Sequence, residues 1–350
     1  MTPRESVEVV LKGGLADYIP FTIYENKIPQ CAAERRLRNQ GVCIVQRISP
    51  PVYKIIMPNI NVTGMSYTEN GKHLVKTQYQ TPVGVLYTIT EPAGFTFWTH
   101  KHLFGRPEDY KPLLYLVNDM QFESNYDEFA YALNVDGGDS FFRGSLGLEP
   151  MQTLISDYMS SETFCMEWFD RRDEVLKLYN ALVKKRRQVY SLCADSPCMA
   201  FNYGGNVTPE ILGAERFKDY YVPHYNEAAD VLHSKGKLIG VHFDANCKMI
   251  SEAIAQTKLD YIEAFTPSPD TDMTLAEARR VWPDKVLWIN FPSSVHLESV
   301  ETIKQTTRDL LVQMGSPKKF IMGITEDIPE NHWRENLLAI SETLLEYKIK

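Results

Sequence analysis

The chain has 350 residues, of which 44% are hydrophobic and 23% are charged, a composition typical of a globular protein in water. Its net charge of −8 disfavours a nucleic-acid partner, because such partners need a basic surface. No uncharged apolar run reaches the length of about 18 residues that a membrane helix requires. The six cysteines show no Cys-x-x-Cys spacing, so we expect reduced thiols and a cytoplasmic protein without a membrane partner.

The N-terminal segment predicts a helix, a strand and a second helix. The first helix follows a Thr2 cap and ends at "KGG" (12–14), and charges interrupt its apolar pattern, unlike that of a signal peptide. Residues 17–24 read as a strand, and 31–41 read as a helix that ends at a glycine.

The pattern of apolar and polar residues changes after residue 41. Residues 42–98 alternate between apolar and polar side chains and are broken by turn residues. This pattern predicts antiparallel strands that are inserted after the first strand–helix unit. A further helix is expected from Pro107 to residue 120.

From about residue 128, short apolar strands alternate with amphipathic helices. The predicted strands are 131–136, 198–203, 237–244, 260–266, 285–290 and 320–325. The predicted helices are 172–190, 208–235, 248–257, 274–281, 298–315 and 333–347. Such repetition indicates a parallel sheet that is covered by helices, and no Gly-x-Gly-x-x-Gly loop favours a dinucleotide-binding sheet. We therefore predict an α/β fold: one (β/α)8 TIM barrel domain over 1–350, with the β insertion at 42–98.

Active sites of such barrels lie at the C-terminal ends of the strands. The predicted strand ends here are unusually polar, and polar side chains are costly to bury without partners. They carry Asp136, Asn202, Tyr203, His242, Asp244, Glu263, Asn290, Glu326 and Asp327.

A metal site is one interpretation of this rim. His242 and Asp244 lie two residues apart and therefore point to the same face of a strand, and Glu263 and Glu326 follow other strands. A histidine with two or three carboxylates can hold Zn(II) and leave a position for substrate. The alternative is a proton-sharing polar network without a metal. Cys247 is a less favoured ligand because it lies past the strand end, in the first turn of a helix.

Other residues near the rim are candidates for substrate binding. Asn202, Tyr203 and Asn290 would orient a substrate, and aromatic residues outside the strand cores, such as Tyr24, favour an aromatic one. The glycine pair in "FNYGGN" (201–206) suggests a close approach of the backbone to another group.

Nearly the whole chain resembles the uroporphyrinogen decarboxylase superfamily, whose members are (β/α)8 barrels. The resemblance lies in "PRESVEVVLKGGLADYIPF" (3–21), "PEDYKPL" (107–113), "HFD" (242–244) and "GITEDIPENHWRENLLAISETLLEY" (323–347). The decarboxylases of this superfamily bind substrate carboxylates with an Arg-Gln-Ala-Gly-Arg-type segment. Here the region reads "ENKIPQCAAERRLRNQG", and that motif is absent.

A second branch of the superfamily consists of cobalamin-dependent methyltransferases. Their zinc is bound by a His-x-Cys pair and a later cysteine, whereas this sequence has Asp244 in place of the first cysteine and Glu326 near the second. The runs "ERRLRNQG", "HFDANC", "YIEAFTPSP" and "WINFPSSVH" resemble methyltransferase components of O-demethylase systems.

That resemblance implies the transfer of a methyl group from a methoxylated substrate, such as an aryl methyl ether, to the cobalt of a partner corrinoid protein. Zn(II) would be bound by His242, Glu326 and one of Asp244 or Glu263, and the partner would dock on the C-terminal barrel face near 42–98 and 263–273. A homodimer is compatible with the sequence. The alternatives are a decarboxylating lyase that acts on another carboxylated substrate, and a non-catalytic corrinoid-binding scaffold.

Overall fold

The computed structural model describes residues 1–47, 50–94 and 96–349, so residues 48, 49 and 95 of the predicted insertion lie outside the described part. The chain divides into two compact units. The barrel unit comprises Met1–Val52, Asn125–Gly147 and Cys193–Lys350, and the insertion unit comprises Tyr53–Ser124 and Leu148–Leu192. The assignment of 1–350 to a single domain stays a prediction.

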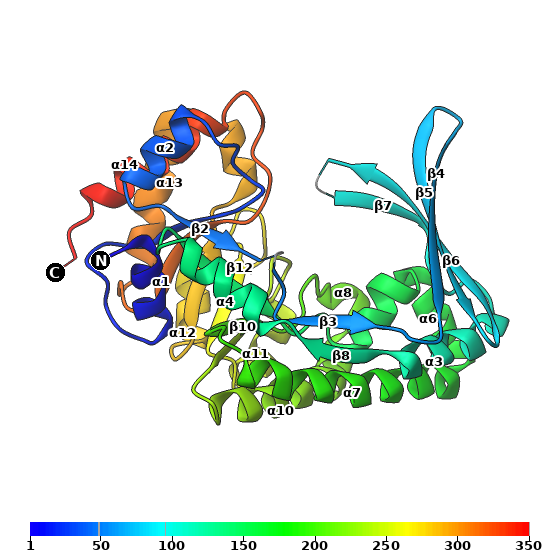
Figure 1. Cartoon of the computed structure of the whole chain (residues 1–350). Helices are drawn as coiled ribbons and strands as arrows, with labels where there is room; N and C mark the ends of the chain where they lie inside the picture. Colours follow the sequence, from blue (N-terminus) through cyan, green and yellow to red (C-terminus); the bar gives the residue numbers. More distant parts are fainter. Residues whose placement is uncertain (48–49, 95, 350) are drawn as a thin grey trace. The chain divides into compact units, whose positions relative to one another are not determined.

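The barrel unit is a closed ring of eight parallel strands. Figure 1 labels some of these strands and several of the helices of this unit. In chain order these are β1 (Phe21–Tyr24), β2 (Cys43–Gln46), β9 (Ser140–Ser145), β10 (Ala200–Asn202), β11 (Leu238–His242), β12 (Tyr261–Phe265), β13 (Val286–Asn290) and β14 (Phe320–Ile324). β14 pairs with β1, and β2 lies between β1 and β9. The predicted (β/α)8 architecture is confirmed.

Helices surround this ring. They are α1 (Pro3–Leu11), α2 (Ala32–Asn39), α4 (Tyr126–Val135), α8 (Pro209–Leu212), α9 (Ala214–Tyr220), α10 (Val222–His233), α11 (Ser251–Ala255), α12 (Leu275–Val281), α13 (Val300–Gln313) and α14 (Trp333–Glu346), with short 3₁₀ turns at Lys248–Ile250 and Ser293–Leu297. The first helix begins at the predicted Thr2 cap, where Thr2 and Glu5 exchange hydrogen bonds in a capping box.

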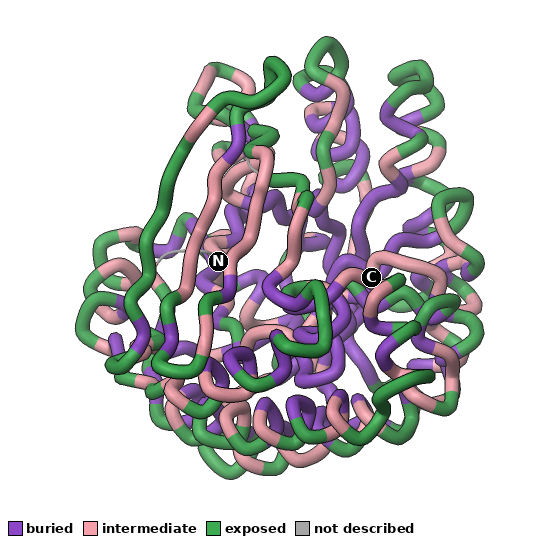
Figure 2. The backbone as a smooth tube through the Cα atoms, turned by 90° about the vertical axis from the view of Figure 1, so that its right-hand side faces the viewer, coloured by how far each residue is buried: buried purple, intermediate pink, exposed green. Residues whose placement is uncertain are grey.

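The strands are buried on both faces, as expected for a parallel sheet that helices cover. Every residue of β1, β12, β13 and β14 is buried, and Figure 2 shows buried segments gathered in the interior. Tyr24, Phe141, Tyr261 and Trp288 belong to one core cluster. Gly240 makes room for this packing, because a Cβ added there would lie 2.2 Å from the Tyr261 ring.

Two predictions about the early strands are wrong. "VCIVQRI" is not the first strand of an antiparallel insertion, because β2 pairs in parallel with β1 and β9. The run at 131–136 is not a strand but the end of helix α4, and the strand is β9, after the turn that follows. Asp136 therefore precedes β9 and pairs with Arg4 at 2.9 Å, so it does not lie at a strand's C-terminal end.

The insertion unit is built of antiparallel strands and helices. β3 (Tyr53–Ile56) pairs with β8 (Gln121–Ser124), and β4 (Asn61–Glu69), β5 (Lys72–Thr81), β6 (Gly84–Ala93) and β7 (Thr96–Lys101) form one sheet. Its helices are α3 (Tyr110–Asp119), which follows a 3₁₀ turn at Pro107–Asp109, then α5 (Pro150–Gln152), a π-helical turn (Thr153–Tyr158), α6 (Ser161–Asp170) and most of α7 (Arg172–Asp195). The predicted antiparallel insertion is confirmed, with a later start than predicted.

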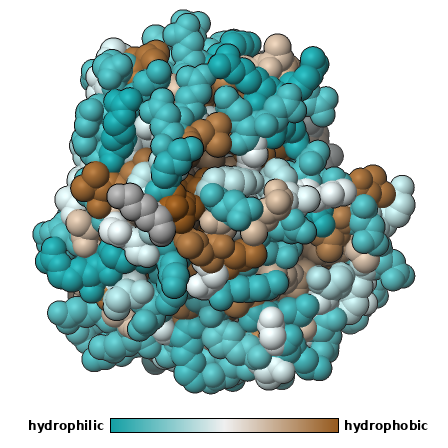
Figure 3. All heavy atoms as spheres, turned by 90° about the vertical axis from the view of Figure 1, so that its left-hand side faces the viewer, coloured by the Kyte–Doolittle hydropathy of each residue, from teal (hydrophilic) through white to brown (hydrophobic). Residues whose placement is uncertain are grey.

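The surface that carries the two chain ends is largely hydrophilic (Figure 3). Within residues 1–47, 50–94 and 96–349, no helix combines the length and apolar composition needed to span a bilayer.

Candidate active site

Glu263 is the centre of a buried polar network inside the barrel. Its carboxylate is fully buried and accepts hydrogen bonds from the Tyr24 hydroxyl and, at 2.8 Å, from Nδ2 of Asn202. Arg143 places a guanidinium nitrogen 2.6 Å from Oε2, and Nδ1 of His242 lies 2.9 Å from the same oxygen. These five side chains come from β1, β9, β10, β11 and β12, so the closed barrel brings them together.

This network keeps Glu263 ionised. Burial alone would raise the pKa of its carboxyl group, but the charge of Arg143 and the hydrogen bond and charge of His242 outweigh burial, and the pKa falls well below its usual range. Burial and the neighbouring Glu263 raise the pKa of the Tyr24 phenol well above its usual value. Tyr24 is therefore a neutral hydrogen-bond donor to a buried carboxylate.

His242 lies between two carboxylates. Nδ1 faces Glu263, and Nε2 lies 3.4 Å from Oδ2 of Asp244. Burial lowers the pKa of His242, but the hydrogen bonds to Asp244 and Glu263 and their charges raise it to about 9. The pKa of Asp244 is lowered, because the hydrogen bond and charge of His242 exceed the opposing effect of burial. Without a metal, the pair is therefore an imidazolium and a carboxylate at neutral pH.

A group of potential metal ligands lies on the other side of the imidazole. His242, Asp244 and Glu326 each offer one ligand atom, and these atoms lie within 4.8 Å of one another. All three are partly exposed, so a ligand from solvent can reach them. Burial and the charge of Asp244 raise the pKa of Glu326. One nitrogen and two carboxylates fit a divalent cation such as Zn(II).

Glu263 has a different position from these three potential ligands. It bonds to Nδ1 of His242 and is not part of the ligand group. In metal sites a carboxylate commonly accepts a hydrogen bond from the second ring nitrogen of a ligating histidine, which fixes the tautomer and the orientation of the ring. The geometry thus favours Asp244 over Glu263 as the ligand beside His242 and Glu326.

Two backbone segments beside His242, in β12 and in the loop after β10, have unusual geometry. β12 has a register irregularity between Glu263 and Phe265, and Ala264 adopts a left-handed φ of 60°. Such bulges re-aim neighbouring side chains and are common beside active sites. In the loop after β10, a Cβ added to Gly205 would lie 3.1 Å from Cβ of His242. The close approach expected of the glycine pair is confirmed, and its partner is His242.

Three other predicted site residues, Tyr203, Asn290 and Asp327, have partners outside the Glu263 network. Tyr203 is buried and packs edge-on against Tyr225, with the ring centroids 5.7 Å apart. Asn290 accepts a hydrogen bond from the Thr325 amide at 2.8 Å, so it ties β13 to the segment after β14. Asp327 pairs with Lys27 at 2.9 Å.

Cys247 does not belong to the ligand group. Its buried thiol donates to the Ala245 carbonyl at 3.2 Å, and burial raises the pKa of the thiol. A thiol held in the protonated state is a poor metal ligand.

Two arginines were not among the predicted site residues. Arg143 lies on β9, the strand that was misplaced, and Arg47 follows β2 and stacks with its guanidinium 3.5 Å from the centroid of the Tyr24 ring. A signal for Arg143 exists in the sequence "SFFRGS", because an arginine inside an apolar strand requires a buried acidic partner.

Comparison with known proteins places the chain in a family. The family model described as uroporphyrinogen decarboxylase (URO-D) matches residues 153–347. The chain belongs to the uroporphyrinogen decarboxylase family. Comparison with curated protein sequences gave no match.

Comparison with solved structures concerns the fold. A methyltransferase from Methanosarcina mazei superposes with a TM-score of 0.59 at 11% sequence identity, over 99% of this chain and 99% of that chain. At this level of identity the similarity concerns the fold alone. A structure of the pneumococcal virulence factor StrH gives a TM-score of 0.40 at 10% identity, over 97% of this chain and 87% of that chain.

Proposed function

We propose that this protein is a methyltransferase that moves a methyl group from a methoxylated substrate, of the aryl methyl ether class, to the cobalt of a partner corrinoid protein. The observation that carries the proposal is the convergence of His242, Asp244 and Glu326 at the C-terminal end of the barrel. The Methanosarcina mazei methyltransferase shares the barrel fold, so the fold is compatible with this reaction class.

The chemistry explains why oxygen ligands suit this reaction. The methyl–oxygen bond breaks with its electron pair on oxygen, and the methyl group bonds to cobalt(I). The phenoxide or alkoxide that leaves must be stabilised by a Lewis acid or by a proton. No thiol is activated in this reaction, so the cysteines of thiol-activating relatives are not required.

Each side chain of the network has a role in this proposal. Nε2 of His242 and the carboxylates of Asp244 and Glu326 would hold the Zn(II), which supplies Lewis acidity at the leaving oxygen. Glu263 holds Nδ1 of His242 and thereby aims Nε2 at the two carboxylates. Without a metal, the His242 imidazolium or a protonated Glu326 can deliver the proton instead.

Asn202 is the best supported of the predicted substrate-binding residues. Its Nδ2 is bonded to Glu263, while its buried Oδ1 has no hydrogen-bond partner among the described residues. A buried unpaired carbonyl is costly, so a donor on the substrate would satisfy it. Tyr24 acts in this proposal through Glu263, and the amide of Asn290 is already bonded within the protein.

Docking of the corrinoid protein on the C-terminal barrel face stays a prediction. The 263–273 loop is a suitable fixed surface, because Asp270 accepts from the Ser294 amide at 3.1 Å and Asp272 accepts from the Cys247 amide at 3.1 Å. In the insertion unit, β7 exposes Phe97 and Trp98, and exposed aromatics are enriched where proteins bind one another.

A decarboxylase is the second candidate. The matching family model bears that description, and Nε of the buried Arg143 has no hydrogen-bond partner among the described residues, so a substrate carboxylate could bind there. Release of CO₂ from a carboxylated substrate, without methyl transfer, would favour this candidate.

The metal site is tested by equilibrium dialysis against Zn(II), followed by metal analysis. We expect one tightly bound ion per chain. Asp244→Asn and Glu326→Gln should each weaken binding at least about tenfold, because each replaces an anionic ligand by a neutral one. Cys247→Ser is the matched control and should bind as the unaltered protein does. Absence of bound metal, or a loss caused by Cys247→Ser alone, would contradict the site.

A further inference from the structure

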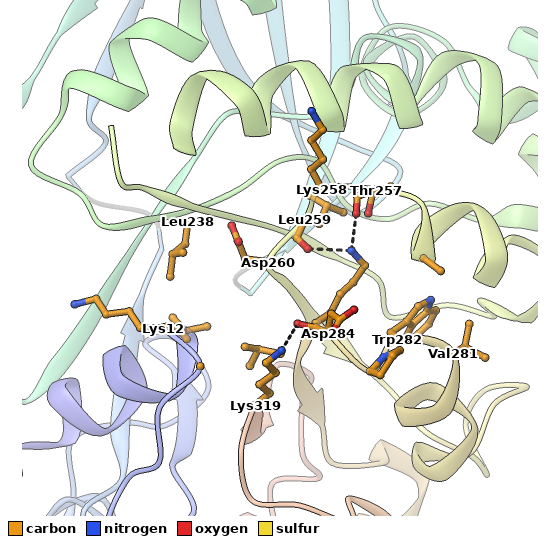
Figure 4. A pocket seen from close by; sticks show the side chains of 16 residues that line it. Lys12, Leu238, Thr257, Lys258, Leu259, Asp260, Val281, Trp282, Asp284 and Lys319 are labelled. Atoms are coloured by element: carbon orange, nitrogen blue, oxygen red, sulfur yellow. Dashed lines mark hydrogen bonds between the residues drawn. The ribbon is translucent and has the colours of Figure 1, made fainter. Parts of the chain in front are cut away.

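A cavity lies at the opposite end of the barrel from His242. It has a volume of about 440 Å³ and is lined by residues at the starts of strands, including Leu238, Lys285 and Lys319 (Figure 4). This volume falls within the range of about 300–1,000 Å³ that is usual for small-molecule sites. Nothing in the proposed methyl transfer uses this end of the barrel.

Lys285 brings a buried ammonium group to this cavity. Its Nζ donates to the carbonyls of Thr257 at 2.8 Å and Leu259 at 2.9 Å, the contacts drawn as dashed lines in Figure 4. An ammonium group has three N–H donors, so these two carbonyls leave one donor for another acceptor. The side chain is 6% exposed, and burial lowers its pKa to about 8. A buried cation of this kind is stabilised by an anion beside it.

Lys319 adds a second ammonium group at a backbone position that favours glycine. Its φ is 60°, in the left-handed region where a side chain strains the backbone. Its Nζ donates to the Asp284 carbonyl at 2.8 Å and lies beside Asp284 in Figure 4. The Lys319 carbonyl, which accepts from Arg279, would be present in glycine as well, so the strain is offset by what the side chain contacts. The side chain itself therefore accounts for a lysine here.

The two aspartates of the cavity, Asp260 and Asp284, raise the pKa of Lys285 through their charge but do not form an ion pair with it. Asp260 accepts from Nε2 of His233 and from the Ile239 amide, both at 2.8 Å. Within the described part of the chain, neither Lys285 nor Lys319 forms an ion pair. A third lysine of the wall, Lys258, is paired with Asp230, and Figure 4 shows its amino group pointing away from Lys319. With Lys12, the lining has four lysines against two aspartates, in a chain whose net charge is −8.

We propose that this cavity binds the phosphate group of a small metabolite between Lys285 and Lys319. A phosphate offers several acceptor oxygens, so it can accept hydrogen bonds from more than one ammonium group. The remaining volume can hold a small organic group, and the wall that Leu11 and Leu238 contribute is apolar. This site is independent of the methyl-transfer proposal.

The test compares two probes, inorganic phosphate and glycerol 3-phosphate, by calorimetric titration and by thermal unfolding against sodium chloride of equal ionic strength. We expect one probe or both to bind and to raise Tm by at least about 2 °C. Tighter binding of glycerol 3-phosphate would indicate a phosphate ester as the natural ligand. Tighter binding of inorganic phosphate would indicate the free ion.

The informative variant is Lys319→Gly, because it removes the ammonium group and also relieves the backbone strain. It should fold, with a Tm in chloride that is not lower, yet bind the better probe at least about tenfold more weakly. Lys258→Gln is the matched control from the same wall and should bind as the unaltered protein does. If phosphate stabilised the fold only as a salt, it would raise Tm equally in the unaltered protein, in Lys319→Gly and in Lys258→Gln. Absence of binding to both probes, or binding that is unchanged in Lys319→Gly, overturns the proposal.

Discussion

Arg143→Met is expected to lower the free energy of unfolding by about 3 kcal/mol, at the lower end of the range for breaking a buried ion pair. Arg143 and Glu263 approach to 2.6 Å, with 9% and 0% of their side chains exposed. Methionine leaves the Glu263 carboxylate buried without its main cation. The hydrogen bonds from Tyr24, Asn202 and His242 keep the loss from being larger.

Denaturant unfolding measures this loss, and Arg36→Met is its control. Arg36 and Glu342 also approach to 2.6 Å, but 59% and 35% of their side chains are exposed, so we expect a loss below about 1 kcal/mol. Adding Glu263→Gln to Arg143→Met should restore part of the stability, because the uncompensated charge is then removed. Equal losses in the two single variants would show that Glu263 does not depend on Arg143.

In metal-free protein, the stability that depends on His242 should fall by about 3 kcal/mol between pH 6.5 and 9. The folded-state pKa of His242 is about 9, whereas an unfolded histidine titrates near about 6.5. Between these values the folded protein holds a proton that the unfolded chain has released, so stability decreases as pH rises. Below pH 6.5 the contribution is fully present.

The measurement is urea unfolding across this pH range with a chelator, for the unaltered protein and for His242→Gln. The difference between the two isolates His242, because opposing groups such as Lys285, whose pKa is lowered to about 8, are common to both. Bound Zn(II) should remove the slope, since a ligating imidazole must be deprotonated. A difference that grows more favourable as pH rises would mean that His242 is buried as the neutral imidazole.

The barrel could be predicted because its later strands are short, apolar and separated by amphipathic helices. The runs that became β11 to β14 are buried on both faces, and burial on both faces leaves a clear pattern in the sequence. β9 was missed because "YALNV" in α4 is an apolar run of similar length, whereas β9 carries Arg143. Period alone does not separate a short buried helix segment from a strand.

The site, like the fold, could be predicted only in part. The strand-end rule brought His242, Asp244 and Glu326 to one edge, and the structure gathers these three as potential ligands. The separate role of Glu263 could not be predicted, because its partners Tyr24, Arg143 and Asn202 come from β1, β9 and β10. The register of the strands determines which side chains meet inside a closed barrel. The sequence alone does not predict that register.

Methyl transfer itself is tested by adding cobalt(I) cobalamin to the Zn(II)-loaded protein with a panel of methoxylated aromatic compounds, and by following the absorbance of methylcobalamin. We expect methylcobalamin to form with at least one methoxylated compound and to be lost in His242→Ala, with Cys247→Ser unaffected. No methylcobalamin with any compound, or formation that continues undiminished in His242→Ala, would contradict the account.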